Sequence, residues 1–209
     1  MIAVTAAAVS KSLDNAINMD GIVQANTVGV DRGEIIIYAG SDASFTTEAN
    51  VDINIGGKIS AVGAGNNEYG GDVLVLGSPI LELSKQPNIS IKENAQINVS
   101  GEKSGGTISL AGNTVKIGEN YFRREMLLAT GLGSGMGGVI SVRGKQIDIV
   151  GRLSAIPGSG RQNYWEGGYI IIHFSDSFSM DGAMDVGYLG SPSFGAVTIE
   201  RINENNWGY

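Results

Sequence analysis

The chain has 209 residues and carries 14 basic against 21 acidic side chains, which gives a net charge of −7 at neutral pH. This charge repels phosphate backbones and anionic membrane surfaces, so nucleic acid is not an expected partner. The chain has no cysteine, which excludes disulfides and thiolate metal sites, and no apolar run approaches the roughly 20 residues of a membrane-spanning helix.

The first segment in chain order, residues 3–19, is rich in alanine and contains neither glycine nor proline. Alanine has the highest helix propensity of the amino acids, so this composition predicts a short helix. We expect residues 1–19 to form a helical cap on the elements that follow, because the end of a stack of strands exposes unpaired edges.

The rest of the chain repeats one phrase, in which a glycine precedes a short run of alternating aliphatic residues. Alternation of this kind also predicts strands before most of these glycines and after most of them. The anchor glycines are Gly33, Gly71, Gly106, Gly138, Gly168 and Gly195. The expected preceding strands lie at 21–25, 57–63, 95–101 and 151–158, and the following ones at 80–84, 114–118, 146–151 and 177–182.

About three short strands per repeat, returning in the same order, favour a stack of coils over a sandwich. We therefore predict an all-β fold, a single-stranded right-handed parallel β-helix of about six coils over residues 20–202. Residues 203–209 are expected to form a tail or the start of another coil. Each strand would pair with its equivalent one coil away, at a distance of ~4.8 Å.

Equivalent side chains of successive phrases should then form columns along the stack. Two inward columns are predicted: Ile35, Val73, Ile108, Ile140, Ile170 and Val197, and Ile37, Val75, Leu110, Val142, Ile172 and Ile199. The outward column between them consists of Ile36, Leu74, Ser109, Ser141, Ile171 and Thr198. Its three large aliphatic side chains predict a covering segment or a partner surface.

The pair Gly105–Gly106 opens one copy of the phrase. We expect a sharp corner there, at which the chain needs a positive φ that glycine adopts without a Cβ penalty. The glycine-rich stretch 131–138 lacks the Gly-Lys-Ser/Thr ending of a phosphate loop, so it is predicted to be a loop between strands.

Few residues have the type and spacing that catalysis or metal binding requires, and we predict no catalytic, cofactor-binding or metal-ligating residue. His173 is the only histidine, and the expected register points it outward between Arg143 and Glu200. The nearest approach to an acidic cluster is formed by Asp176, Asp181 and Asp185, close to Arg201. Clustered acids of this kind carry out glycoside chemistry, although no sequence spacing forces these three together.

Two inter-strand loops combine aromatic and charged residues, which is typical of surfaces that bind glycans or proteins. The candidate ligand-contact residues are Tyr121, Phe122, Arg123, Arg124, Arg161, Tyr164 and Trp165. Covering the flank of the stack is the alternative role for these side chains.

The phrases at 19–40, 56–77, 97–112 and 137–160 resemble the repeats of filamentous haemagglutinin-type exoproteins. These are large adhesins that Gram-negative bacteria secrete by the two-partner pathway, and the resemblance covers roughly residues 15–202. It implies a β-helical shaft outside the cell, an outer-membrane partner transporter, and a role in adhesion, haemagglutination or biofilm formation. The family's Asn-Pro-Asn-Gly secretion motif is absent from this chain, which indicates a downstream fragment or another route of export.

Three functions follow as hypotheses. The first is an adhesive, structural segment, secreted or on the surface of a Gram-negative bacterium, that presents loops to a host or bacterial receptor or glycan. The second is a polysaccharide lyase or hydrolase on the same fold. The third is a self-assembling extracellular filament subunit whose copies stack end to end.

Overall fold

The computed structural model describes residues 1–6, 17–27, 32–39, 52–77, 85–119, 124–159, 167–187 and 195–203. Within these ranges the chain forms sixteen strands and no α-helix. Every strand pairing among them is parallel. The predicted all-β class is therefore confirmed, and the sheets are parallel.

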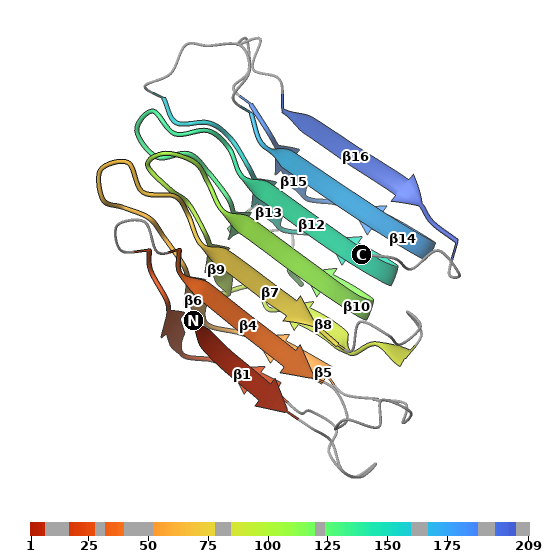
Figure 1. Ribbon diagram of the computed structural model, residues 1–209. Helices are drawn as coiled ribbons and strands as arrows, with labels where there is room; N and C mark the ends of the chain where they lie inside the picture. Colours follow the sequence, from red (N-terminus) through yellow and green to blue (C-terminus); the bar gives the residue numbers. More distant parts are fainter. Residues whose placement is uncertain are drawn as a thin grey trace.

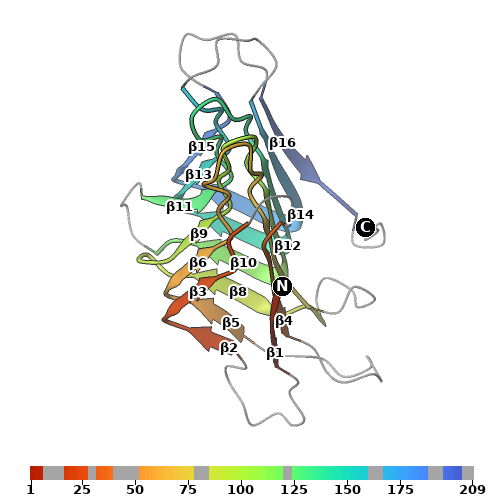
Figure 2. The ribbon, with the colours of Figure 1, turned by 60° about the vertical axis from the view of Figure 1, so that its left-hand side comes forward.

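The strands stack in three ladders, which Figures 1 and 2 show from two sides. Ladder A contains β1 (Ile2–Ala6), β4 (Glu34–Ala39), β7 (Asp72–Leu76), the first halves of β10 (Thr107–Ile117), β12 (Val139–Ile149) and β14 (Tyr169–Met180), and β16 (Ala196–Arg201). Ladder B contains β2 (Ile17–Met19), β5 (Asp52–Ile55), β8 (Asn88–Ile91) and the second halves of β10, β12 and β14. Ladder C contains β3 (Ile22–Gln24), β6 (Lys58–Ser60), β9 (Gln96–Asn98), β11 (Glu125–Leu128), β13 (Arg152–Ser154) and β15 (Ala183–Asp185).

The order of the strands along the chain is regular. The chain passes through ladders A, B and C in turn from β1 to β15 and then returns to ladder A at β16. Each strand consequently lies beside the strand that occupies the same place one repeat earlier or later. In ladder A seven strands stack in this way (Figure 1).

Both predicted inward columns of ladder A are confirmed by the strand register. Ile35 pairs with Val73, which pairs with Ile108, and the same register continues through β12, β14 and β16. The side chains of these columns are fully buried from β4 to β14, whereas Val197 and Ile199 on β16 are 41% and 45% exposed. The aliphatic core therefore runs the length of the stack and reaches the surface at β16.

Ladders B and C add further columns to this core. In ladder B one column consists of Ile17, Ile53, Ile89, Val115, Ile147 and Phe178. In ladder C the central column consists of Val23, Ile59, Ile97, Leu127, Leu153 and Met184. The members of both columns belong to the same hydrophobic cluster as the columns of ladder A or pack against it.

The predicted outward column of ladder A is also in register from Ile36 to Thr198. All six of its side chains are half-buried. The covering segment or partner surface expected over its large aliphatic residues remains a prediction.

The predicted N-terminal helix over residues 3–19 is wrong at both of its ends. Residues 2–6 form β1 and residues 17–19 form β2, while residues 7–16 lie outside the described ranges. Ile2 pairs with Ile35 and Val4 with Ile37, so β1 extends the inward columns by one strand. Pairing with the edge of β4 outweighs the helix propensity of the alanines, because propensity is a weak preference that tertiary contacts override.

Some of the short strands of ladders B and C were predicted from the sequence, and others were missed. The phrases at 114–118, 146–151 and 177–182 overlap the ends of β10, β12 and β14, and those at 21–25, 57–63, 95–101 and 151–158 contain β3, β6, β9 and β13. Residues 80–84 are not among those that the structure describes, and the ladder-B strands of the earlier repeats, β5 and β8, were not predicted. The ladder-C strands β11 and β15 were also missed, because the residues of β11 do not alternate between apolar and polar and because the phrase at 177–182 was ended before Ala183.

The anchor glycines have a reason other than the predicted one. Among the described glycines only Gly118 and Gly133 have a positive φ, so a left-handed corner at Gly105–Gly106 is wrong. A Cβ on Gly106 would instead lie 1.8 Å from the carbonyl oxygen of Gly71, and one on Gly105 would lie 2.1 Å from the carbonyl oxygen of Ala129. Close approach of neighbouring backbones, which leaves no room for a side chain, explains these glycines.

Candidate functional site

The predicted ligand-contact loops are described only at Arg124. Its side chain is exposed, and Nη1 donates a hydrogen bond of 3.2 Å to the side-chain oxygen of Asn94. The other six candidates, Tyr121, Phe122, Arg123, Arg161, Tyr164 and Trp165, lie outside the described residues. Their role in ligand contact stays a prediction.

His173 lies where the sequence places it. It pairs in register with Arg143 on one side and with Glu200 on the other. Its Nδ1 is 3.4 Å from Nη2 of Arg143 and its Nε2 is 3.6 Å from the carboxylate of Glu200. The histidine is part of a row of polar side chains on the outside of ladder A.

Two of the three aspartates weighed as an acidic cluster are held by different partners. Asp176 lies in β14 and accepts a hydrogen bond of 3.0 Å from Nε2 of Gln146. Asp185 lies in β15 of ladder C and forms an ion pair with Arg152, while Asp181 lies between these two strands. Arg201 donates to the backbone oxygen of Ser175 at 3.1 Å. Across the described ranges, no three histidine, cysteine or acidic residues gather as a metal ion would require.

The ion pair of Arg152 and Asp185 joins β13 to β15, the last two strands of ladder C. The hydrogen bond from Arg152 to Asp185 raises the pKa of the guanidinium, and burial opposes this by a smaller amount. Because both side chains remain partly exposed, at 43% and 30%, solvent screens the interaction. The pair is placed to hold adjacent strands in register rather than to carry out chemistry.

The loops between ladders C and A stack on one another at one edge of the molecule (Figure 1). Gly63 bridges to Gly101, which bridges to Gly131, so successive loops also pair in parallel. The loop predicted at 131–138 is confirmed, since the whole range lies between β11 and β12, with a positive φ at Gly133. Among these stacked loops the ring of Tyr69 lies between two cations: its centroid is 4.6 Å from Cζ of Arg32 and 4.7 Å from Nζ of Lys103.

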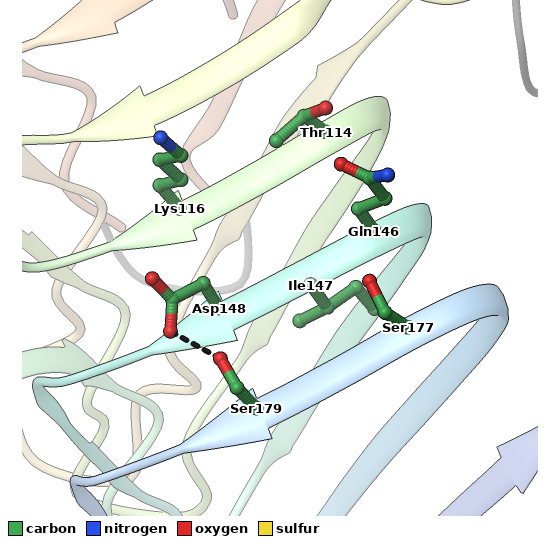
Figure 3. Close-up of a pocket in the computed structure, with 7 residues that line it drawn as sticks. All are labelled: Thr114, Lys116, Gln146, Ile147, Asp148, Ser177 and Ser179. Atoms are coloured by element: carbon green, nitrogen blue, oxygen red, sulfur yellow. Dashed lines mark hydrogen bonds between the residues drawn. The ribbon is translucent and has the colours of Figure 1, made fainter.

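A shallow polar hollow lies on the outer side of ladder B, across β10, β12 and β14. Its volume is ≈ 140 Å³, and all but one of its lining side chains are polar or charged (Figure 3). The lining residues are Thr114, Lys116, Gln146, Ile147, Asp148, Ser177 and Ser179. Sequence reasoning missed this site, although the polar residues are the outward positions of strand phrases that it did identify.

Two hydrogen bonds order the polar side chains of the hollow. Oγ of Ser179 donates to Oδ1 of Asp148 at 2.5 Å (Figure 3). Nε2 of Gln146 donates to Asp176 at 3.0 Å, beside the hollow. The acceptor atoms Asp148 Oδ2 and Gln146 Oε1 are thereby held on side chains whose orientation is already fixed.

No helix among the described residues is long and apolar enough to cross a membrane. No family model, curated protein or solved structure matches the chain.

Proposed function

We propose that the chain is a right-handed parallel β-helical segment of a surface-exposed attachment protein, in which it acts as a rigid shaft. The observation that carries the proposal is the order in which the strands return. The chain passes through ladders A, B and C in a fixed sequence, and each strand pairs with the equivalent strands of the neighbouring repeats, with register shifts only near Glu125 and Gly144 among the pairs described.

A stack of this kind is suited to act as a long, rigid shaft rather than to enclose a ligand. Seven strands of ladder A at ~4.8 Å spacing span about 29 Å along the stack. Each added coil extends the shaft without changing its cross-section, because every coil contacts only its neighbours. The same inward aliphatic columns then supply the core of every coil.

Export from a Gram-negative cell by the two-partner pathway forms part of the proposal, with an outer-membrane transporter as partner. The absence of cysteine supports it, since a disulfide formed in the oxidising periplasm would hinder threading of an unfolded chain. A transporter gene of this kind next to the gene for this chain is the expected finding. Its absence, together with retention of the protein inside the cell, would contradict this route.

Attachment itself can be tested with beads that carry the purified chain. Beads coated with the folded protein should be retained on epithelial cells or on bacterial lawns, whereas albumin-coated beads should not. Retention should fall when soluble protein is added as competitor. Equal retention of both kinds of bead would remove the attachment function.

End-to-end self-association is a second candidate, and the exposed edge at β16 favours it. Val197 and Ile199 of β16 are exposed, whereas the members of the same two columns from β4 to β14 are fully buried, and an exposed parallel edge offers backbone groups to another strand. Sedimentation velocity should then show oligomers that grow with concentration and that Val197→Lys abolishes. A monomer at all concentrations would exclude this candidate.

The alternative of a polysaccharide-cleaving enzyme receives no support from the acids considered for it. Asp176 is bonded to Gln146 and Asp185 to Arg152, on different ladders. Loss of sugar release on changing Asp176 or Asp181 to alanine would restore that alternative.

A further inference from the structure

The polar hollow on ladder B differs from the outer surface of the preceding coils. In those coils the polar side chains next to the hollow are bonded in a row: Asn88 of β8 donates to Asp52 of β5 at 3.0 Å, and Asn113 of β10 donates to Asn88 at 3.3 Å. In the hollow, by contrast, the side chains of Lys116, Thr114 and Ser177 have no hydrogen bond or ion pair to other parts of the chain that the structure describes. Hydrogen-bonding capacity is therefore left open at this place on the ladder.

The polar side chains of the hollow, those with and those without a hydrogen bond, form a regular grid. Thr114, Gln146 and Ser177 lie in one outward column, and Lys116, Asp148 and Ser179 lie in a second column two residues further along the strands. Parallel strand geometry sets neighbouring groups ~4.8 Å apart along the stack and about 6.6 Å apart along a strand. A ligand lying across the three strands would meet donors and acceptors at regular intervals.

The charges in the hollow limit the class of ligand. Lys116 is the single cation of the lining and faces Asp148 in register, while Asp176 is bonded to Gln146 of the lining, on a chain of net charge −7. A strongly anionic polymer would meet repulsion there. A divalent cation needs several oxygen ligands, yet Asp148 and Asp176 are each engaged by another side chain.

We propose that this hollow is the binding site for a neutral, hydroxyl-rich glycan chain that lies across β10, β12 and β14. Sugar hydroxyls both donate and accept, which matches a lining of hydroxyl, carboxamide, carboxylate and ammonium groups. The Asp148 carboxylate accepts from one sugar hydroxyl, and the Lys116 ammonium donates to another. Ser179 and Asp176 position Asp148 and Gln146, so little side-chain ordering is needed on binding.

This inference rests on the proposed attachment function, for which it names the ligand class and the contact surface. The binding test uses the full chain and a panel of neutral hexasaccharides, namely cellohexaose, maltohexaose and chitohexaose, with hexagalacturonate as the anionic comparison. Calorimetric titration should show binding of at least one neutral hexasaccharide and tighter binding of it than of hexagalacturonate.

Two variants test the site itself. Lys116→Ala and Asp148→Ala should each weaken neutral-glycan binding by about tenfold, since each removes a charge-assisted hydrogen bond. Lys58→Ala, which removes an exposed lysine from ladder C, is the matched control and should bind as the unchanged chain does. Circular dichroism and thermal unfolding should show that all three variants are folded.

The outcomes separate the site from the function. Bead retention that survives in both site variants, or binding that neither variant weakens, would overturn the glycan site and leave the attachment function standing. Failure of every neutral hexasaccharide to bind, or a preference for hexagalacturonate, would likewise overturn the site. If beads coated with the unchanged chain are retained no better than albumin-coated beads, the attachment function is removed instead.

Discussion

The carbonyl oxygen of Gly71 lies where a Cβ on Gly106 would stand, 1.8 Å from that position. That same oxygen accepts a hydrogen bond of 3.1 Å from the backbone N–H of Thr107. The Gly106 N–H in turn donates to the carbonyl of Val99 at 2.7 Å. Gly106 thus links ladder C to ladder A, and the carbonyl group of Gly71 occupies the space that a side chain on Gly106 would need.

Gly106→Ala should destabilise the protein by ~3 kcal/mol or more, because the new methyl group meets backbone that cannot rotate away. Gly21→Ala is the matched control, since a Cβ there would meet nothing within 4 Å, and its effect should stay within ~0.5 kcal/mol. Chemical denaturation measures both values. A Gly106→Ala variant as stable as the control would contradict the close approach of the two backbones.

The stability lost when a side chain of an aliphatic column is truncated to alanine should depend on the position of that side chain along the stack. Ile140→Ala, in the fully buried part, is expected to lower the free energy of unfolding by ~2–5 kcal/mol. Val197→Ala removes a side chain that is 41% exposed and should lower it by less than ~1 kcal/mol. Similar losses at both positions, measured by urea unfolding, would show that the column is not continuous.

The ion pair of Arg152 and Asp185 should make a small, salt-sensitive contribution. A double-mutant cycle of Arg152→Ala and Asp185→Ala is expected to give a coupling of about 0.5 kcal/mol, which falls in 1 M salt. Because the folded-state pKa of Arg152 is raised, its contribution is present below the ordinary arginine pKa and disappears only as the pH rises through the raised value. A coupling that vanishes between neutral and mildly alkaline pH would contradict this assignment.

The ladder-A columns could be predicted from sequence because their signal is repeated. Alternating aliphatic residues after a glycine return six times, and only stacking of equivalent strands buries both columns together. The position of His173 between Arg143 and Glu200 followed from the same register. Where one strand is fixed by repetition, its outward neighbours are fixed as well.

The parts that sequence did not predict depend on contacts rather than on local pattern. Residues 2–6 become a strand because the edge of β4 is available to pair with Ile2 and Val4, a fact that alanine content does not reveal. The role of Gly106 depends on the carbonyl of Gly71, 35 positions away in the sequence. The hollow of ladder B requires Lys116 and Asp148 to be compared in register, which the reading of single phrases omitted.

The central claim, that equivalent strands lie directly over one another in parallel, can be tested by distances between spin labels. The chain has no cysteine, so cysteines introduced in pairs at Ser109, Ser141 and Thr198 can be labelled specifically. These outward positions lie on β10, β12 and β16. Electron paramagnetic resonance should give backbone separations that increase from Ser109–Ser141 through Ser141–Thr198 to Ser109–Thr198, about 4.8, 9.6 and 14.4 Å for one, two and three strand spacings. A Ser109–Ser141 separation equal to or longer than that of Ser109–Thr198 would contradict the parallel stack.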